Sequence, residues 1–313
     1  MTDETSQALA SALAPRLALL RAVATEGHLT RAAERLGIPQ PTVSRWLAAL
    51  ADELGTPVLL RDGRGVRLSR AGEYLADAAG RALTVLESGC RRVVEEVDPE
   101  RGQVVLAFLH TMGESRVPLL LRAFRRERPQ VRFTLLQGAQ DEVLDRVRSG
   151  RADLALTSPL PDPEEFEYAR LDEQPLVVAV PAGHRFADRD RITLAELAGE
   201  TFVGMSPGHG LRQMTDELCA AAGFTPELAF EGEEADTVRG LVAAGLGVAV
   251  LPVAERWATE DNPTGTPRGW PGLLELPLTP HASRQIGLVW AANRPLAPAA
   301  RAFRQFTMRH SQS

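Results

Sequence analysis

The chain has 313 residues, 35 of them basic and 41 acidic, so its net charge is −6. This length suits about two domains, and the 44% share of hydrophobic residues beside 24% charged residues is typical of a folded globular chain, not of a disordered one. Two cysteines are too few for a disulfide framework or a Cys-rich zinc site. The longest apolar run, near residues 241–254, is shorter than the roughly 20 residues that span a bilayer, and the acidic opening Met1–Glu4 is unlike a secretory signal. We therefore expect a cytoplasmic protein with no membrane segment.

The overall charge conceals an uneven distribution. Residues 11–70 contain nine arginines and five acidic residues, a net charge of +4, which leaves −10 on the rest of the chain. A basic N-terminal segment on an acidic body is the asymmetry that nucleic-acid binding produces. The chain contains no lysine, so cationic side-chain contacts to DNA have to be made by guanidinium groups.

The first 54 residues predict three helices. Apolar spacing favours a helix over 13–25, and Thr30 is a suitable N-cap for a short helix over 31–36. Gly37 ends that helix, and a third helix follows over 40–54. Two helices joined by a short turn that contains glycine, with a polar N-terminal end on the second, have helix-turn-helix geometry. The polar end consists of Gln40, Thr42, Ser44 and Arg45.

Two short strands, 58–61 and 66–68, flank a Gly-rich tip and predict a hairpin wing. The wing carries Arg61, Arg64 and Arg67, which suit phosphates and the minor groove. The alternative is a three-helix cap with ordinary surface arginines, but the ordered set of turns, helices and wing favours DNA binding.

Several stretches resemble the winged helix-turn-helix of LysR-type transcriptional regulators, namely residues 19–27, 30–37, 40–45, 53–55 and 68–73. The resemblance continues more loosely through nearly the whole chain. It implies that the third helix faces double-stranded DNA and that Arg61 lies on the wing. The DNA-binding set that we expect is Thr30, Arg31, Gln40, Pro41, Thr42, Ser44, Arg45, Arg61, Arg64 and Arg67. The chain departs from the family pattern at His28–Leu29, Trp46, Ala51 and Leu60, and Trp46, in place of a polar residue, bears on base choice.

A long helix is predicted from Arg70 to Val97, with Ser69 as its cap, and residues 98–100 read as a linker. One narrow apolar stripe follows it: Leu75, Ala79, Ala82, Leu86, Cys90, Val93 and Val97. Such a seam pairs with another helix, and in the resembled family two of these helices pair in a dimer. Cys90 is read as a packing residue in preference to a redox contact.

The remaining two-thirds alternate strand and helix, which predicts a doubly wound parallel sheet. The expected fold class is α/β, with an all-α winged helix-turn-helix, a linker helix and a two-lobed effector domain like the type II periplasmic binding proteins. The family resemblance implies that a final helix near 299–307 returns to the first lobe. The predicted divisions are 11–68 for DNA binding, 69–98 for dimerisation, 102–173 with 291–308 for lobe I and 174–290 for lobe II.

Ligands bind at the carboxyl ends of strands in such sheets. The loops there supply the expected effector site: His110, Thr111, Gly138, Ala139, Ser158, Ser206 and His209. By the family resemblance, Thr111 is the strongest contact, because a Ser or Thr there commonly holds a carboxylate, whereas Ala139 lacks a hydroxyl that is often present. His110 and His209 suit an anion or a metal, but the more ordinary reading is surface or supporting histidines. We expect no metal and no cofactor other than a small effector, of which a carboxylate is the leading class.

Two other functions fit parts of the sequence. Gly204–Gly208 matches the G-x-S-x-G nucleophile elbow of serine hydrolases, with Ser206 as nucleophile. However, the oxyanion hole needs the backbone N–H of the following residue, and Pro207 has none. A plain solute-binding protein would not need the N-terminal module. Neither alternative is preferred, and we expect no enzyme.

The expected partners are an interrupted dyad in promoter DNA and a second copy of the chain in a dimer or tetramer, with RNA polymerase as a further candidate. Family members that sense peroxide use two cysteines in the effector domain. Only Cys219 lies there in this chain, which argues against that mechanism.

Overall fold

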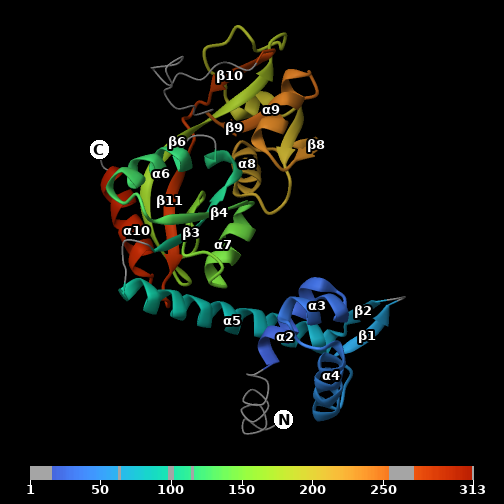
Figure 1. The fold of residues 1–313 in the computed structure, drawn as a ribbon. Helices are drawn as coiled ribbons and strands as arrows, with labels where there is room; N and C mark the ends of the chain where they lie inside the picture. Colours follow the sequence, from blue (N-terminus) through green and yellow to red (C-terminus); the bar gives the residue numbers. More distant parts are fainter. Residues whose placement is uncertain (1–15, 63–64, 98–101, 114–115, 254–270, 312–313) are drawn as a thin grey trace. The chain divides into compact units, whose positions relative to one another are not determined.

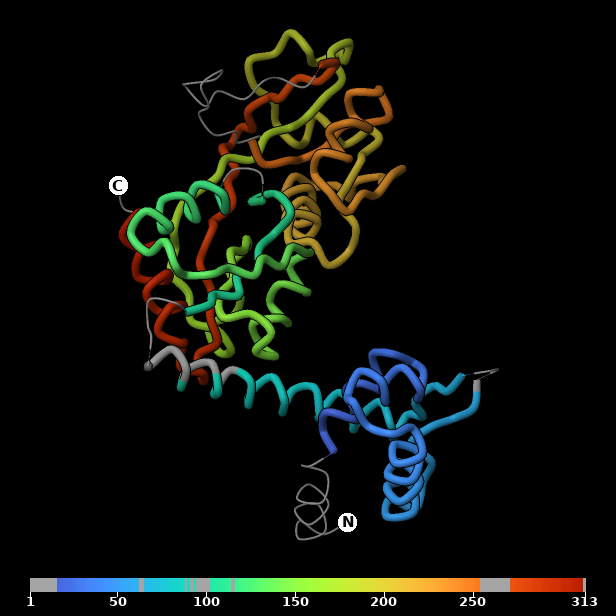
Figure 2. Tube along the Cα trace, viewed as in Figure 1, coloured from blue at the N-terminus to red at the C-terminus, as the bar shows by residue number. Residues whose placement is uncertain are grey.

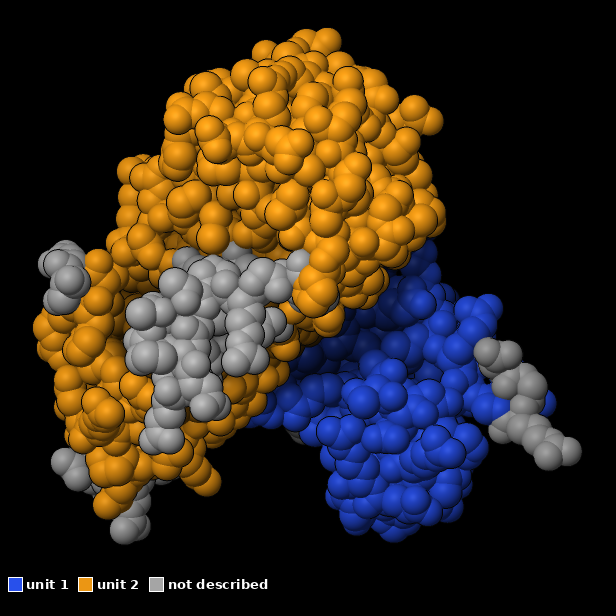
Figure 3. All heavy atoms as spheres, turned by 90° about the horizontal axis from the view of Figure 1, so that it is seen from above, with its two compact units in different colours: residues 1–91 blue, residues 92–313 orange. Residues whose placement is uncertain are grey.

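The computed structural model describes residues 16–62, 65–97, 102–113, 116–253 and 271–311. The chain forms two compact units, 1–91 and 92–313 (Figures 1 and 3). The predicted start of the first helix at Leu13, the linker at 98–100 and the wing residue Arg64 lie outside the described residues. Among the described residues, no helix is both long enough and apolar enough to cross a membrane.

The first unit contains the three expected helices: α2 (Leu17–Glu26), α3 (Leu29–Leu36) and α4 (Gln40–Leu54). Each ends at a glycine with positive φ, and these glycines are Gly27, Gly37 and Gly55. One prediction here is wrong, because Thr30 is not the N-cap of α3. His28 has the extended cap conformation, and the amide of Ala32 donates to the His28 carbonyl at 3.0 Å, so the helix begins one residue before Thr30.

Buried side chains from all three helices form one core, which includes Leu20, Ala32, Val43 and Leu50. Trp46 is partly buried and packs against this core. Its indole therefore contributes to the packing of the unit, and its effect on base choice stays a prediction.

The predicted wing is a hairpin of β1 (Leu59–Asp62) and β2 (Gly65–Leu68), antiparallel with Leu59 opposite Leu68. Helix α5 then runs over Arg70–Val97, as predicted. Ser69 caps it, because the Ser69 hydroxyl accepts from the amide of Gly72 at 3.1 Å and donates to the carbonyl of Pro57 at 2.5 Å. The cap therefore anchors α5 to the segment before the wing.

Gly72 is pressed against that same segment. A Cβ at this position would lie 2.2 Å from the carbonyl oxygen of Val58, which is backbone and cannot rotate away. We expect Gly72→Ala to destabilise the first unit by about 1–3 kcal/mol, the usual cost of overpacking. Gly80→Ala on the same helix meets nothing within 4 Å and should stabilise it by about 0.5–1 kcal/mol. Amide hydrogen exchange of α3 and α4 measures this unit separately, and equal protection in the two variants would contradict the prediction.

The second unit begins at Arg92, within α5, and continues with β3 (Gln103–Leu109), the one-turn helix η3 (His110–Met112) and α6 (Arg116–Glu127). Then follow β4 (Arg132–Gly138), α7 (Gln140–Arg148), β5 (Leu154–Thr157) and the long β6 (Phe166–Pro181). The remaining elements are η4 (Leu194–Leu197), β7 (Thr201–Met205), α8 (Gly210–Ala221), β8 (Glu227–Gly232), α9 (Ala235–Ala243), β9 (Ala249–Pro252), β10 (Leu273–Pro277), β11 (Ser283–Ala291) and α10 (Pro298–His310).

The main sheet has the order β10-β6-β11-β5-β3-β4, with β9 also paired to β6. It is mixed, so the prediction of a parallel sheet is wrong in part. β3 is parallel to β4 and β5, but β11 is antiparallel to both β5 and β6, and β9 and β10 are antiparallel to β6. The reason is that β11 returns from the later half of the chain in the opposite direction. A separate parallel pair consists of β7 and β8.

Two hydrophobic clusters fill this unit. The first includes Val104, Leu156 and Phe124, and α10 adds Phe303 and Phe306, as expected for a final helix that returns to the first lobe. Phe124 contacts both of these rings edge to face, at centroid distances of 5.0 and 5.2 Å. The second cluster includes residues of 176–278 only. β6 contributes to both, and β11 runs beside it (Figure 2).

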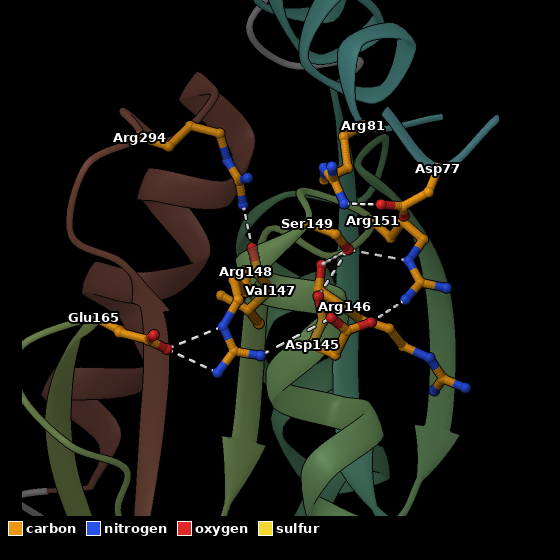
Figure 4. A network of polar contacts seen from close by, with 10 residues as sticks. All are labelled: Asp77, Arg81, Asp145, Arg146, Val147, Arg148, Ser149, Arg151, Glu165 and Arg294. Atoms are coloured by element: carbon orange, nitrogen blue, oxygen red, sulfur yellow. Dashed lines mark hydrogen bonds and ion pairs between the residues drawn. The ribbon is translucent and has the colours of Figure 1, made fainter. Parts of the chain in front are cut away.

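Arginines anchor the C-terminal end of α7 (Figure 4). Arg294 donates to the carbonyl of Val147 at 2.7 Å, which caps the end of the helix. Arg148 binds Glu165 through two hydrogen bonds of 2.9 and 2.7 Å, and Arg151 pairs with Asp145. These contacts fix α7 at one end, while its other end faces the predicted effector loops.

Candidate DNA-binding and effector-binding sites

The N-terminal end of α4 is polar and largely exposed. Val43, Leu47 and Leu50 are buried on one face of this helix. Gln40, Pro41 and Arg45 are exposed, while Thr42 and Ser44 are half-buried. The Gln40 amide donates to the Ser44 hydroxyl at 3.0 Å, which orders the polar end of the helix. Pro41 needs no hydrogen-bond acceptor in this first turn.

The other predicted DNA contacts in the described part of the chain are also exposed: Thr30, Arg31, Arg61 and Arg67. Arg31, Arg45 and Arg67 form no ion pair with a described residue, whereas Arg35 is paired with Glu26 at 2.9 Å and Arg21 with Glu87 at 2.8 Å. The unit therefore presents guanidinium groups to solvent at both the helix and the wing. Phosphate and base edges are the ligands that such groups suit.

In the second unit, Thr111 lies in η3, directly after β3. Its hydroxyl accepts a hydrogen bond from Nη2 of Arg284 at 2.9 Å. Arg284 is 2% exposed, and its Nε donates to the Oε1 of Gln174 at 2.8 Å. The site thus has two polar residues, Arg284 and Gln174, that the sequence reasoning missed.

His110 brings the first strand end close to helix α9. Its Nδ1 lies 3.8 Å from Oε1 of Glu234, the N-cap residue of that helix, and makes no hydrogen bond to a described residue. The carbonyl of His110 also accepts a long hydrogen bond, 3.5 Å, from Gln137 next to Gly138. The strand ends of β3 and β4 are therefore adjacent, as predicted from the parallel pairing.

The loops after β4, β5 and β7 meet at a second place. A Cβ on Gly210 would lie 2.7 Å from the Ser158 carbonyl oxygen, so these two backbones are in close approach. The Asp141 amide donates to the Gly208 carbonyl at 3.4 Å, which joins the start of α7 to the loop before α8. Ala139 is the N-cap residue of α7. The structure therefore brings Ala139 and Ser158 near His209.

Polar atoms at this meeting point lack hydrogen bonds within the described residues. They are Oγ of Ser158, which is 1% exposed, Oγ1 of Thr157 and Nε2 of His209. The Nδ1 of His209 lies 3.0 Å from the Ser206 carbonyl. A cavity of about 430 Å³ opens beside them, and its lining includes Gln140, His209 and Arg212. Buried polar groups of this kind are normally satisfied by water or a ligand.

A Cβ on Gly138 would lie 2.5 Å from Oε2 of Glu142, so a side chain there would require the flexible Glu142 side chain to move. Within the described ranges, no group of three or more His, Cys, Asp or Glu side chains is placed to hold a metal ion. The groups here that could bind a ligand are hydroxyls, imidazoles and one buried guanidinium, all of which form hydrogen bonds.

Cys219 is fully buried in the second cluster. Burial, with a smaller contribution from Asp216, raises the pKa of its thiol to about 11. The thiolate is the form that reacts with peroxide or alkylating agents. Because the pKa of about 11 lies four units above pH 7, only about one thiol in 10⁴ would be ionised at that pH.

We therefore expect Cys219 to be inert in the folded protein. In a Cys90→Ser variant, mass spectrometry after iodoacetamide or hydrogen peroxide should show an unmodified Cys219, and modification should become complete when urea unfolds the chain. Rapid modification of the folded protein would contradict this and reopen the redox interpretation.

Comparisons with known proteins give the family. Residues 15–73 match the model "Bacterial regulatory helix-turn-helix protein, lysR family", and residues 98–312 match "LysR substrate binding domain". The HTH-type transcriptional regulator YybE of Bacillus subtilis (strain 168) is 35% identical over 295 residues, which cover 94% of this chain and 98% of YybE.

Solved structures agree with this result. Full-length CbnR in complex with its target DNA has a TM-score of 0.68, with 24% identity over 95% of this chain and 99% of CbnR. The effector-binding domain of QuiR in complex with shikimate has a TM-score of 0.59, with 27% identity over 68% of this chain and 98% of that domain. The matched residues include both units, and the chain therefore belongs to the LysR family of transcriptional regulators, with an N-terminal DNA-binding helix-turn-helix and a C-terminal effector-binding domain.

Proposed function

We propose that α4 enters the major groove of an interrupted dyad in promoter DNA and that the wing contacts the flanking backbone. The observation that carries this proposal is that three exposed arginines form no ion pair with a described residue: Arg31, Arg45 and Arg67. Arg61, Gln40, Pro41, Thr42, Ser44 and Thr30 complete the described part of the contact surface, and Arg64 is proposed from the sequence alone. Glutamine suits adenine and arginine suits guanine in the major groove.

The test is the salt dependence of binding to the promoter region upstream of the protein's own gene, measured by fluorescence anisotropy. Release of counterions predicts that log Kobs falls linearly with log[salt], with a slope of roughly −0.9 for each phosphate neutralised. A slope near zero would overturn the proposal. The protein would then have no more affinity for duplex DNA than its overall charge of −6 suggests.

We further propose that a small effector binds the C-terminal domain at His110, Thr111, Gly138, Ala139, Ser158, Ser206 and His209. A carboxylate is the favoured class, because these residues include hydroxyls and imidazoles that can donate hydrogen bonds and because the buried Arg284 adjoins Thr111. A thermal-shift screen of small carboxylates, shikimate included, tests this, because a ligand of the folded state stabilises it by mass action.

Thr111→Ala is expected to abolish the stabilisation by any carboxylate that the screen finds and to leave DNA binding unchanged. Loss of one hydrogen bond to a charged group costs about 1.5–3 kcal/mol, or roughly 10- to 150-fold in affinity. Thr111→Ser keeps the hydroxyl and is the matched control. A normal response in the alanine variant would refute the role of Thr111.

The same proposal includes the wider setting of the protein. It acts in the cytoplasm as a homodimer or homotetramer and regulates transcription without catalysis, with RNA polymerase as a further partner. Its functional divisions are the DNA-binding domain 11–68, the linker helix 69–98, lobe I (102–173 and 291–308) and lobe II (174–290). The support for self-association is the apolar stripe on α5, where Leu86 is 61% exposed and Val93 69% exposed.

A further inference from the structure

A chain of side-chain hydrogen bonds runs between the two hydrophobic clusters of the effector-binding domain. It starts at the Thr111 hydroxyl, which accepts from Nη2 of Arg284 at 2.9 Å. Nε of Arg284 donates to Oε1 of Gln174 at 2.8 Å, and Nε2 of Gln174 donates to the carbonyl of Val253 at 3.0 Å. Arg284 and Gln174 are only 2% and 4% exposed. The chain thus connects the second residue after β3 with the residue after β9.

The two central residues lie where the long strands pass from one cluster to the other. Arg284 on β11 is paired in register with Gln174 on β6. On β6, Phe166 belongs to the first cluster and Leu176 to the second. Beside Gln174, the amide of Val253 donates to the Pro175 carbonyl at 3.0 Å, which holds the end of β9 against β6. Any change in the angle between the two clusters has to pass through these strands.

Arg284 determines the direction of every hydrogen bond in the chain. A guanidinium group only donates, so the Thr111 oxygen must accept from it, and the Thr111 proton is left to point elsewhere. Gln174 must present its oxygen to Arg284, which directs its amide nitrogen to Val253. The Thr111 hydroxyl can therefore donate its proton to an effector, which suits an effector that offers an acceptor oxygen.

We propose that Arg284 and Gln174 are positioning residues that couple the hydroxyl of Thr111 to the arrangement of the two clusters. The proposal rests on the proposed role of Thr111 in effector binding. An acceptor oxygen that binds the Thr111 hydroxyl affects the hydrogen bond between Thr111 and Arg284. Arg284 and Gln174 join the two strands that cross between the clusters. Occupancy of the site and the angle between the clusters are therefore linked. A buried polar network whose members are hydrogen-bonded to one another is suited to specify one such arrangement.

The coupling is tested without any effector, by pulsed electron paramagnetic resonance on the full-length protein. Spin labels are attached to Arg128→Cys, beside the first cluster, and to Asp188→Cys, beside the second, since both native residues are exposed. Cys90 is changed to serine, and Cys219 stays buried and unlabelled. Labelled parent protein, diluted into an excess of unlabelled protein so that distances within one chain dominate, should give one narrow distance distribution. Arg284→Met, Gln174→Leu and Thr111→Val should each broaden it or shift its maximum.

Three comparisons separate coupling from general damage. Arg284→Lys, which retains the charge, should restore part of the narrow distribution. Arg239→Met removes another buried arginine, 4% exposed, whose hydrogen bonds to Asp236 and the Pro252 carbonyl do not involve Thr111. It should lower the melting temperature and leave the distance distribution narrow. The double variant Thr111→Val/Gln174→Leu should resemble either single variant, because both interrupt one chain.

Distance distributions for Thr111→Val and Gln174→Leu that match the parent would overturn the proposal, even if Arg284→Met did not fold. Additive changes in the double variant, or equal broadening by Arg239→Met, would overturn it as well. Because no effector is used, this result is independent of the carboxylate screen. A screen without hits would count against the proposed effector class, whereas unchanged distances would count against the coupling.

Discussion

Arg45→Ala is expected to weaken binding to the specific promoter site by about 1–3 kcal/mol for each half-site, if one bidentate contact to a base is lost. In a dimer the two losses add to about 2–6 kcal/mol, because the half-sites are far enough apart to be independent. Arg45 is exposed at the polar end of α4, opposite the buried Val43 and Leu47. Removal of its side chain should therefore leave the fold intact.

The measurement compares affinity for promoter DNA with affinity for a duplex of scrambled sequence. If Arg45 contacts a base, Arg45→Ala should lose the preference for promoter DNA over the scrambled duplex. If Arg45 contacts a phosphate, the affinity for both duplexes should fall equally. Arg35→Ala is the matched control, because Arg35 is an exposed arginine of the same unit but is paired with Glu26. Footprints identical to those of the parent protein would remove Arg45 from the recognition surface.

Leu86→Glu combined with Val93→Glu is expected to prevent dimerisation and to reduce specific DNA affinity by about 2–5 kcal/mol. That figure is half of the roughly 4–10 kcal/mol that separates specific from non-specific binding, since a monomer reaches one half-site. The two side chains are exposed on one face of α5, together with Cys90. Two carboxylates on that face would be desolvated without partners in a paired helix.

Light scattering after size-exclusion chromatography measures the mass, and anisotropy measures the affinity. Arg81→Glu adds negative charge to the same helix on a different face, where Arg81 pairs with Asp77, and should leave the dimer intact. A double variant that still elutes at the mass of a dimer would show that α5 is not the dimer interface.

Local signals explain why the first unit was predicted well. The helix over 40–54 has the predicted bounds, because a proline opens it and Gly55 in the left-handed region closes it. The misplaced start of α3 shows the limit of this reasoning, because Thr30 is a good cap by type, yet His28 takes the cap conformation.

Long-range contacts explain most of what was missed. The first half of β6 has no apolar run to mark it as a strand, and β10 was not predicted at all. Arg284 and Gln174 are 110 residues apart, and only strand pairing brings them together beside Thr111. The effector loops stay a prediction, and no local pattern in the sequence shows that a buried arginine donates to Thr111.

The path of β11 has a consequence for the order in which the domain is made. The sheet of the first cluster needs β11 between β5 and β6, and its core needs Phe303 of α10, so it cannot be completed until nearly the last residue leaves the ribosome. The second cluster lies within 176–278 and is synthesised earlier. Domains fold as their segments emerge. The half of the domain that begins first along the chain is therefore completed last. β3 to β5 are synthesised before their partner strand β11, which lies more than 120 residues further along the chain.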